Sequence, residues 1–316
     1  MRELLTALLA ACACLPAAAQ QEAHFTQWAF DKLNLNPAYA GVKGRPTASA
    51  LVRSQWVGFE GAPSTQAARF HVPVSYGRVG LGAALENDMI GATRGTQLKL
   101  AYAYHIELGR ETHLSLGIEG ALRHVRIDYS EARVNDLEPL AEAGVSSRLL
   151  PNVGLGAYLY SEVFYVGAAI SRLRKNTLFA PADYAGRRGL ATEVPHLYAM
   201  AGVSLPVGYD LDFRPGVLVK HAEAAPSSVD LNAMFVYDGR YGGGATLRGG
   251  EGPESSLRLS SVALVGQVAI GENGMLGASY DLETTRILTG TVGGFELAYE
   301  HIWGRQRRPG IPCYWH

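Results

Sequence analysis

The sequence predicts an all-β protein, a transmembrane antiparallel β-barrel of about fourteen strands that follows a non-barrel segment at the N-terminus. Three observations favour this fold. Apolar and polar residues alternate along many segments. These segments often reach about ten residues or more, whereas strands of soluble proteins average about five or six. Short and long connections alternate between the segments, as they do in barrels of the bacterial outer membrane.

Residues 1–19 have the pattern of a signal peptide. Arg2 precedes an apolar run, and the run ends at three alanines that suit a signal peptidase. The apolar run is too short to span a bilayer as a helix. The sequence around Cys12 also resembles a lipoprotein cleavage site, and cleavage there would leave a lipidated Cys12. After the leader only Cys313 remains, so no internal disulfide is expected.

Residues 20–44 do not alternate like a strand and form the expected non-barrel segment. Apolar residues such as Phe25 and Trp28 are dense, whereas Asn36 and Pro37 would interrupt a helix. Leaving such aromatic surface in water is unfavourable, so the segment is expected to dock on something. Two alternatives stay open at this point: a segment inserted in its own barrel, or a periplasmic segment that binds a partner.

Residues 45–304 read as strands separated by turns. The clearest example is 98–106, in which Leu98, Leu100 and Tyr102 share one face and Lys99 lies on the other. Residues 256–271 are the weakest example because Val262 to Ile270 is apolar on both faces, so twelve or sixteen strands are alternatives. The predicted strands are 46–57, 64–75, 77–87, 95–109, 111–124, 149–161, 162–172, 194–206, 208–220, 227–238, 241–249, 256–271, 274–284 and 291–304.

A soluble sandwich would also explain the alternation, but the chemistry of the two faces favours a membrane barrel. The apolar face is almost free of charge, as expected where a lysine or arginine costs about 2–4 kcal/mol at the bilayer centre. The other face carries glycine, alanine, serine and tyrosine with scattered charges, which suits a lumen. The charged residues expected in the lumen are Arg53, Arg69, Glu119, Arg123, Asp212, Arg214, Asp230 and Glu296.

The predicted connections fall into two classes. Tight ones lie at 73–77, 109–110, 161–162, 206–208, 238–240 and 272–274. Longer ones lie at 59–63, 87–94, 125–148, 173–193, 221–226, 250–254 and 285–290. An even number of strands puts both termini at the tight-turn end, which faces the periplasm in outer-membrane barrels. The basic tail at 305–316 is therefore expected in the periplasm.

Charge and motifs argue against several function classes. A net charge of −1 gives no electrostatic case for nucleic acid. No Gly-x-Ser-x-Gly nucleophile motif occurs, and the histidines lack metal-ligand spacing. Gly242-Gly243-Gly244 lacks the Gly-Lys-Ser/Thr ending of a phosphate loop. We therefore predict no catalytic residue, metal ligand or cofactor, and contact with outer-membrane lipid as the barrel's solvent.

The segment behind the leader carries the most specific motif of the chain. It reads Glu22-Ala23-His24-Phe25-Thr26-Gln27 and then Asn36-Pro37-Ala38-Tyr39-Ala40-Gly41. Shorter matching blocks follow at 53–65, 87–91, 226–232 and 293–296. With these motifs the chain resembles the PorP/SprF family of Bacteroidota outer-membrane proteins, which is linked to type IX secretion and gliding motility. Glu22-Ala23 stands where the family usually has Asp-Pro.

The resemblance implies a non-enzymatic outer-membrane barrel that serves protein secretion or gliding. The implied partner is a large secreted surface protein, such as a cell-surface adhesin that the barrel binds or anchors, or a periplasmic component of the secretion system. A passive porin is the alternative function. The residues expected to bind the partner or plug the lumen are His24, Phe25, Gln27, Trp28, Asn36, Pro37, Tyr39 and Gly41. The expected lumenal or structural motif residues are Arg53, Trp56, Asp88, Asn232 and Glu296.

Overall fold

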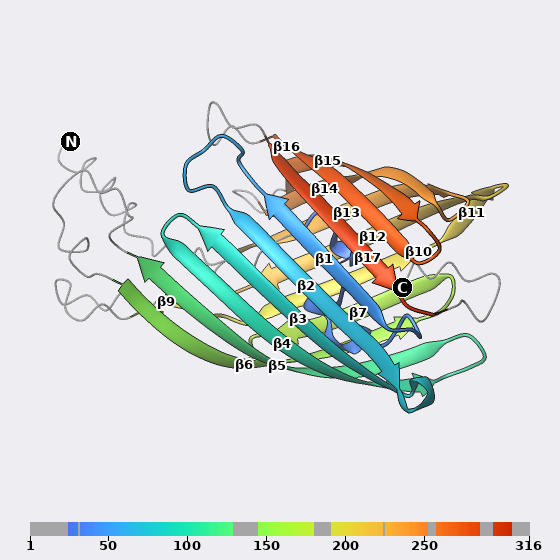
Figure 1. Cartoon of the computed structure of the whole chain (residues 1–316), viewed down its shortest axis with the longest axis horizontal. Coiled ribbons are helices and arrows are strands. Elements are labelled where there is room, and N and C mark those ends of the chain that lie inside the picture. The colour runs from blue at the N-terminus through green and yellow to red at the C-terminus, as the bar shows by residue number, and fades with distance from the viewer. Residues whose placement is uncertain are drawn as a thin grey trace.

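Fifteen strands form one antiparallel sheet in the computed structural model of the chain, and the sheet closes into a barrel (Figure 1). β10 and β11 together occupy one strand position in the barrel wall because both pair with β12, so the barrel has fourteen strand positions. The predicted fold class and strand number are therefore confirmed. The structure describes residues 25–30, 32–128, 145–179, 191–223, 225–251, 257–284 and 293–304.

The strands follow one another around the barrel in chain order, and the pairing of β1 with β17 closes it. Each predicted strand corresponds to a strand of the barrel. The alternation that predicts a strand also determines which of its faces turns to the lumen. The barrel strands are β1 (Thr47–Ser54), β2 (Ser64–Val74), β3 (Val79–Ile90), β4 (Thr93–Glu107), β5 (His113–Asp128), β6 (Val145–Tyr160), β7 (Phe164–Ser171), β10 (His196–Val203), β11 (Leu205–Gly208), β12 (Leu211–Ala222), β13 (Ala225–Tyr237), β14 (Tyr241–Glu251), β15 (Leu257–Ile270), β16 (Gly274–Glu283) and β17 (Gly294–Ile302).

The two faces of the wall have the predicted chemistry. In β4, Leu100 is 58% exposed on the outer face, whereas the neighbouring Lys99 is 4% exposed on the inner face. Phe235, Tyr299 and Trp303 are also exposed on the outside, as expected for an aromatic girdle. An apolar exterior around a charged interior is the arrangement that a bilayer requires of a barrel. In the described part of the chain, no helix is long and apolar enough to cross a membrane.

The connections differ in length between the two ends of the barrel, with two corrections to the prediction. We call the end at which β1 begins and β17 ends the tight-turn end, and the opposite end the long-loop end. The long connections predicted at 87–94 and 221–226 are wrong. β3 continues to Ile90 and β12 to Ala222, so only two residues separate each from the next strand. Polar residues above the lipid belt continue these strands, which hides their ends in a hydropathy pattern.

The long connection predicted at 173–193 contains structure that the sequence did not indicate. β8 (Thr177–Phe179) and β9 (Ala191–Thr192) pair with each other as a separate ribbon, apart from the barrel sheet. Further changes affect the barrel hairpin before it: β5 extends to Asp128 and β6 begins at Val145. This hairpin therefore reaches farther toward the long-loop end than its pattern predicts.

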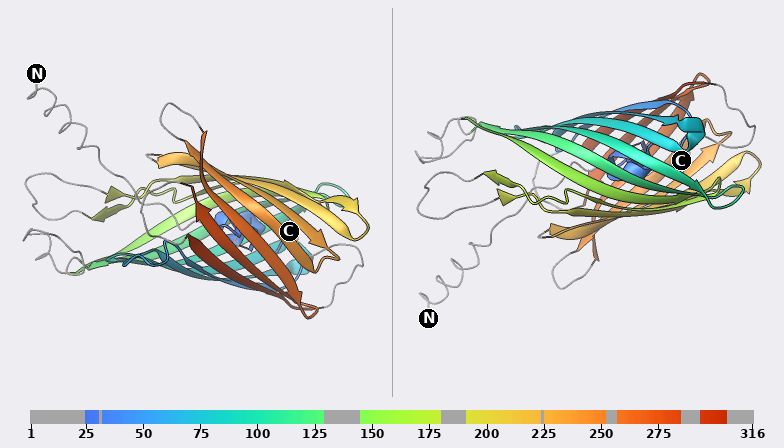
Figure 2. Two further views of the ribbon diagram at one scale, coloured as in Figure 1. Left: turned by 90° about the horizontal axis from the view of Figure 1, so that it is seen from above. Right: turned by 90° about the horizontal axis from the view of Figure 1, so that it is seen from below.

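Three short helical turns lie inside the barrel, drawn in blue in Figure 2. They are η1 (Trp28–Phe30), α2 (Lys32–Leu35) and η2 (Pro37–Tyr39). We call residues 25–30 and 32–43 the lumenal segment. Nearly all of its described side chains are buried, and they form hydrophobic clusters with inward-facing residues of the wall. The core of the protein is therefore the contact between the barrel and its own N-terminal segment.

Candidate functional site

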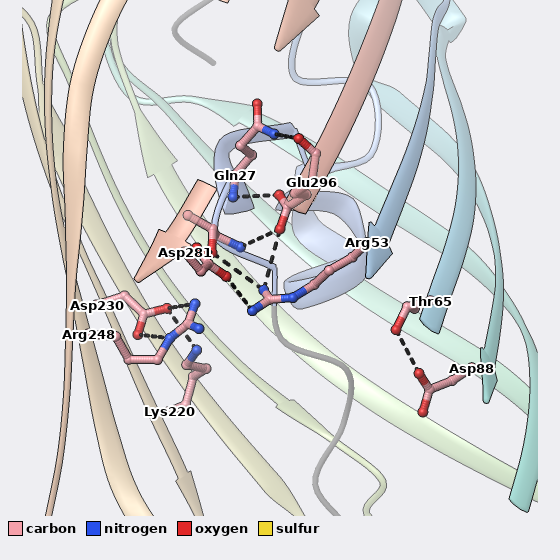
Figure 3. A network of polar contacts seen from close by, with 10 residues as sticks. Gln27, Arg53, Thr65, Asp88, Lys220, Asp230, Arg248, Asp281 and Glu296 are labelled. Carbon is pink, nitrogen blue, oxygen red and sulfur yellow. Dashed lines mark hydrogen bonds and ion pairs between the residues drawn. The ribbon is translucent and has the colours of Figure 1, made fainter. Parts of the chain in front are cut away.

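The first residues of the lumenal segment are bound by a carboxylate from the last strand (Figure 3). Glu296 of β17 accepts the backbone N–H of Thr26 at 2.8 Å and that of Gln27 at 2.7 Å, one on each carboxylate oxygen. The Gln27 side-chain amide returns a hydrogen bond of 3.2 Å to the Glu296 carbonyl oxygen. Hydrogen bonds to a charged group are stronger than neutral ones, so this contact anchors the segment firmly.

Arg53 of β1 extends this contact to a second carboxylate. Its guanidinium lies 2.6 Å from Asp281 of β16 and 3.4 Å from Glu296. Asp281 in turn accepts the Thr26 hydroxyl at 2.6 Å. The strand register brings the wall residues together, because Arg53 stands opposite Glu296 in the β1–β17 pair. We call Thr26, Gln27, Arg53, Asp281 and Glu296 the clasp.

A second group of buried charges lies beside the clasp (Figure 3). Asp230 of β13 accepts from Lys220 at 2.8 Å and from Arg248 at 3.0 and 3.3 Å. With Arg53, Asp281 and Glu296, the two groups hold three cations and three carboxylates. A buried charge is tolerated when it is paired and hydrogen-bonded, and breaking one such pair costs roughly 3–5 kcal/mol. The buried charges on this side of the wall are therefore compensated.

The Asn36-Pro37 dipeptide fixes the other half of the lumenal segment. The Asn36 side-chain oxygen accepts the Ala38 N–H at 3.0 Å, which caps η2, and Pro37 takes the first helical position. The Asn36 amide nitrogen donates to the carbonyl oxygens of Ala157 in β6 and Ala168 in β7, at 3.0 and 3.3 Å. One side chain thus shapes the turn and attaches it to two strands.

Inward-facing glycines make room for this turn. A Cβ at Gly80 of β3 would collide with the Ala40 carbonyl oxygen, and one at Gly156 of β6 would collide with the Asn36 side chain. A Cβ at Gly117 of β5 would collide with the Ala38 backbone nitrogen. We call Gly80, Gly117 and Gly156 the glycine cradle. Glycine allows this close approach of two backbones, which no other residue would.

Two histidines and an aromatic group hold the end of the segment. Gly41 adopts a left-handed conformation, with φ of 79°, and donates its N–H to Nδ1 of His71 at 3.2 Å. Nε2 of His105 lies 2.9 Å from the Ala40 carbonyl oxygen. The Tyr39 ring packs edge-on against His71 with 5.5 Å between ring centroids. The motif residues Tyr39 and Gly41 therefore belong to the same contact between the lumenal segment and the barrel wall as the glycine cradle.

The remaining predicted residues lie in several places. Phe25 is buried against Leu51, Ala67 and Ala298, and Trp28 is buried in the larger lumenal cluster. Asp88 accepts a hydrogen bond from Thr65, and Asn232 donates one to Thr246. Trp56 is half-buried in the connection between β1 and β2. His24 lies outside the described residues.

Sequence reasoning missed several members of this site. Asp281 and Thr26 complete the clasp, and Lys220 and Arg248 bind Asp230. The alternation of β16 does place Asp281 on the inner face with Ser279, so that signal was present. The pairing partners depend on the register of several strands, which no local pattern contains. No group of His, Cys, Asp or Glu that could hold a metal occurs in the part of the chain that the structure describes.

Comparison with known proteins agrees with this architecture. A family model described as "Type IX secretion system membrane protein PorP/SprF" matches residues 17–300. No curated protein matches the chain. Among solved structures, the CymD monoaromatic hydrocarbon channel is similar at 12% identity with a TM-score of 0.53, over 92% of this chain and 96% of that one. A Pseudomonas aeruginosa FadL homologue gives 11% identity and a TM-score of 0.48, over 90% and 96% of the two chains. At 12% identity the likeness to the hydrocarbon channel concerns the fold alone.

Proposed function

Because this chain belongs to the PorP/SprF family of type IX secretion system membrane proteins, we propose that it works as a non-enzymatic binding or anchoring platform in the outer membrane. Its partner would be a secreted surface protein, such as an adhesin, or a periplasmic component of the secretion or gliding machinery. In this proposal the barrel holds a protein at the membrane, and the lumenal segment braces the barrel from within.

The observation that carries the proposal is the occupation of the lumen by the chain's own residues. The clasp holds Thr26 and Gln27, and the glycine cradle receives Asn36 to Gly41. An interior with charge-paired, hydrogen-bonded and closely fitted contacts suits a rigid scaffold better than a water-filled channel. A scaffold exposes only its two ends to other proteins, which is where partners would bind.

The lengths of the connections support one orientation of the barrel in the membrane. Outer-membrane barrels place short turns in the periplasm and long loops outside. We therefore infer that Thr47 and Ile302, which pair at the tight-turn end, lie near the periplasmic surface. A secreted partner would then meet the long-loop end, and a periplasmic component would meet the tight-turn end, where β1 begins and β17 ends.

A passive porin is the second candidate, and the likeness of the fold to a hydrocarbon channel is what favours it. An open pore needs a continuous water path past the lumenal segment. The packing of Trp28, Tyr39 and the clasp inside the wall argues against such a path.

Affinity purification from solubilised outer membranes tests the proposed function. We expect a large secreted or periplasmic protein to co-purify with the full chain. Substitution of Phe25, Trp28, Asn36 or Tyr39 by alanine should reduce its recovery and its display on the cell surface. Gly120→Ala is a matched control, since a Cβ there meets no neighbour. Normal surface display and no recovered partner with the unaltered chain would contradict the proposal.

A further inference from the structure

One strand of the barrel is longer than its neighbour and leaves an edge with which no other described strand pairs. β6 pairs with β5 from Val145 to Tyr160, but it pairs with β7 only from Leu155 to Tyr160. Beyond this point the chain leaves the sheet at Arg172, which has a left-handed φ of 56°. The ribbon strand β8 comes near β6 but pairs with β9. Among the described residues, no strand pairs with the β7 side of β6 before Leu155.

The backbone groups on this side can be identified from two contacts. The Leu173 N–H donates to the carbonyl oxygen of Val153 at 3.1 Å, and the Asn176 amide donates to that of Pro151 at 3.0 Å. Both oxygens therefore point toward β7. In an antiparallel strand every second residue presents its N–H and C=O to the same side. Val145, Ser147 and Leu149 consequently present theirs to this side, and we call these three residues the β6 edge.

Pro151 is consistent with this assignment. Proline has no N–H, so within a sheet it is confined to strands whose N–H would face an unpaired edge. Pro151 occupies the next position in the same alternation, beside the β6 edge. Its partner on β5, Leu122, is unaffected because the missing donor faces away from β5.

The β6 edge lies in water beyond the lipid belt. Ser147 stands opposite Arg126 of β5, which faces outward with a side chain that is 49% exposed. A charged side chain at this position is incompatible with hydrocarbon, and so are unpaired backbone groups. The edge is therefore a solvent-accessible template at the long-loop end, where an added strand could pair.

The chemistry around the edge indicates what would bind there. Only an extended backbone offers donors and acceptors at the spacing of Val145, Ser147 and Leu149. The side chains of Val145 and Leu149 are exposed and apolar on the outer face. Arg148 is exposed on the other face and has no ion-pair partner among the described residues. A complementary strand would alternate apolar residues with acidic ones.

We propose that the β6 edge captures an extended, acidic segment of the secreted surface protein by strand addition. This inference rests on the proposed function and names the place and the mode of binding. The added strand would lie beside β6 on the side of β7, beyond the point where β7 ends, and would run antiparallel to β6. Its backbone would form hydrogen bonds with the N–H and C=O groups of the β6 edge, and an acidic residue would form an ion pair with Arg148.

Site-specific photocross-linking in intact cells tests the inference. A benzoylphenylalanine at position 147 probes the edge, and one at Leu155 is the control, since Leu155 faces outward where β6 is paired with β7. We expect position 147 to cross-link to one extended acidic segment of the co-purifying surface protein. Leu149→Pro removes one edge donor without breaking the β5 ladder and should reduce this adduct at least tenfold. Leu149→Ala keeps the donor and should leave the adduct within about twofold.

The possible outcomes distinguish strand addition at the β6 edge from the proposed platform function. If the surface protein co-purifies equally with the unaltered chain and with Leu149→Pro, and position 147 gives no adduct, strand addition is wrong and the platform function stands. If no partner co-purifies with the unaltered chain, both fail. An adduct with lipid or with this chain itself also overturns strand addition. Heat-modifiable migration checks the fold, and Val145→Pro replaces Leu149→Pro if that variant does not fold.

Discussion

Gln27 and Glu296, which are 269 positions apart in the chain, are joined by a hydrogen bond of 2.7 Å from the backbone N–H of Gln27 to the carboxylate of Glu296. The bond connects the start of the lumenal segment to the strand that closes the barrel. Folding of the segment and closure of the wall are thereby coupled, since Glu296 also stands opposite Arg53 of β1. The stability of the closed barrel should therefore depend on the segment inside it.

Removing the charge of Glu296 should destabilise both the lumenal segment and the closure of the barrel wall. Glu296→Gln keeps the side-chain volume but leaves Arg53 with one carboxylate and weakens the contacts to Thr26 and Gln27. We expect the free energy of unfolding to fall by roughly 3–5 kcal/mol, as for other broken buried ion pairs. Urea unfolding in detergent micelles measures it. The control is Glu107→Gln at an exposed position of β4, and equal stability of the two variants would rule out the clasp.

The glycine cradle predicts that alanine substitutions at two glycines of β5 have different effects on the lumenal segment. Gly117→Ala places a methyl group against the Ala38 backbone and should displace the lumenal segment, whereas Gly120→Ala meets open space. Because backbone cannot yield as a flexible side chain can, we expect faster protease cleavage within residues 32–43 for Gly117→Ala only. Identical digestion of both variants would contradict the close approach.

Asn36 has two functions that a single substitution separates. Asn36→Asp keeps the oxygen that caps Ala38 but loses the donors to Ala157 and Ala168. The loss of both hydrogen bonds and the buried charge of the aspartate should lower the thermal midpoint more than Asn36→Ala does, because alanine introduces no charge. Differential scanning calorimetry compares the two. A smaller loss with Asp than with Ala would show that the cap dominates.

The lipid-facing surface predicts a depth-dependent penalty. Leu100 and Leu108 are both 58% exposed, but Leu100 lies in the middle of β4, and Leu108 lies in the turn that follows it. Leu100→Arg should reduce the free energy of folding into lipid vesicles by about 2–4 kcal/mol, and Leu108→Arg by about 0–1 kcal/mol. A similar loss at both positions would contradict the assigned belt.

Much of the fold could be predicted because local alternation contains it. Leu98 to Tyr102 shows in five residues which side faces lipid, and this holds in the barrel. The ends of β3 and β12 could not be predicted, since polar residues at a strand end beyond the belt resemble a loop. The β6 edge was equally hidden, because it depends on where the following strand stops.

The site could be predicted only in part, for a related reason. The motif at Asn36 to Gly41 indicated a special turn, and the inward phase of Arg53 and Glu296 indicated lumenal charge. Which charge meets which is determined by pairing between β1, β16 and β17, at opposite ends of the chain. The cradle needed the structure as well, since a glycine in a strand looks the same whether it faces lipid, as Gly120 does, or another backbone, as Gly117 does.

Ion conductance in planar bilayers tests most directly whether the lumen is closed by the chain's own segment. The full chain and a variant lacking residues 21–41 would each be refolded, checked for heat-modifiable migration and inserted under the same salt and voltage. We predict no stepwise conductance from the full chain and clear steps from the deletion variant, because nothing then packs against the cradle or against Arg53, Asp281 and Glu296. Equal conductance of the two proteins would contradict a lumen occupied and closed by the lumenal segment, and would favour the passive porin.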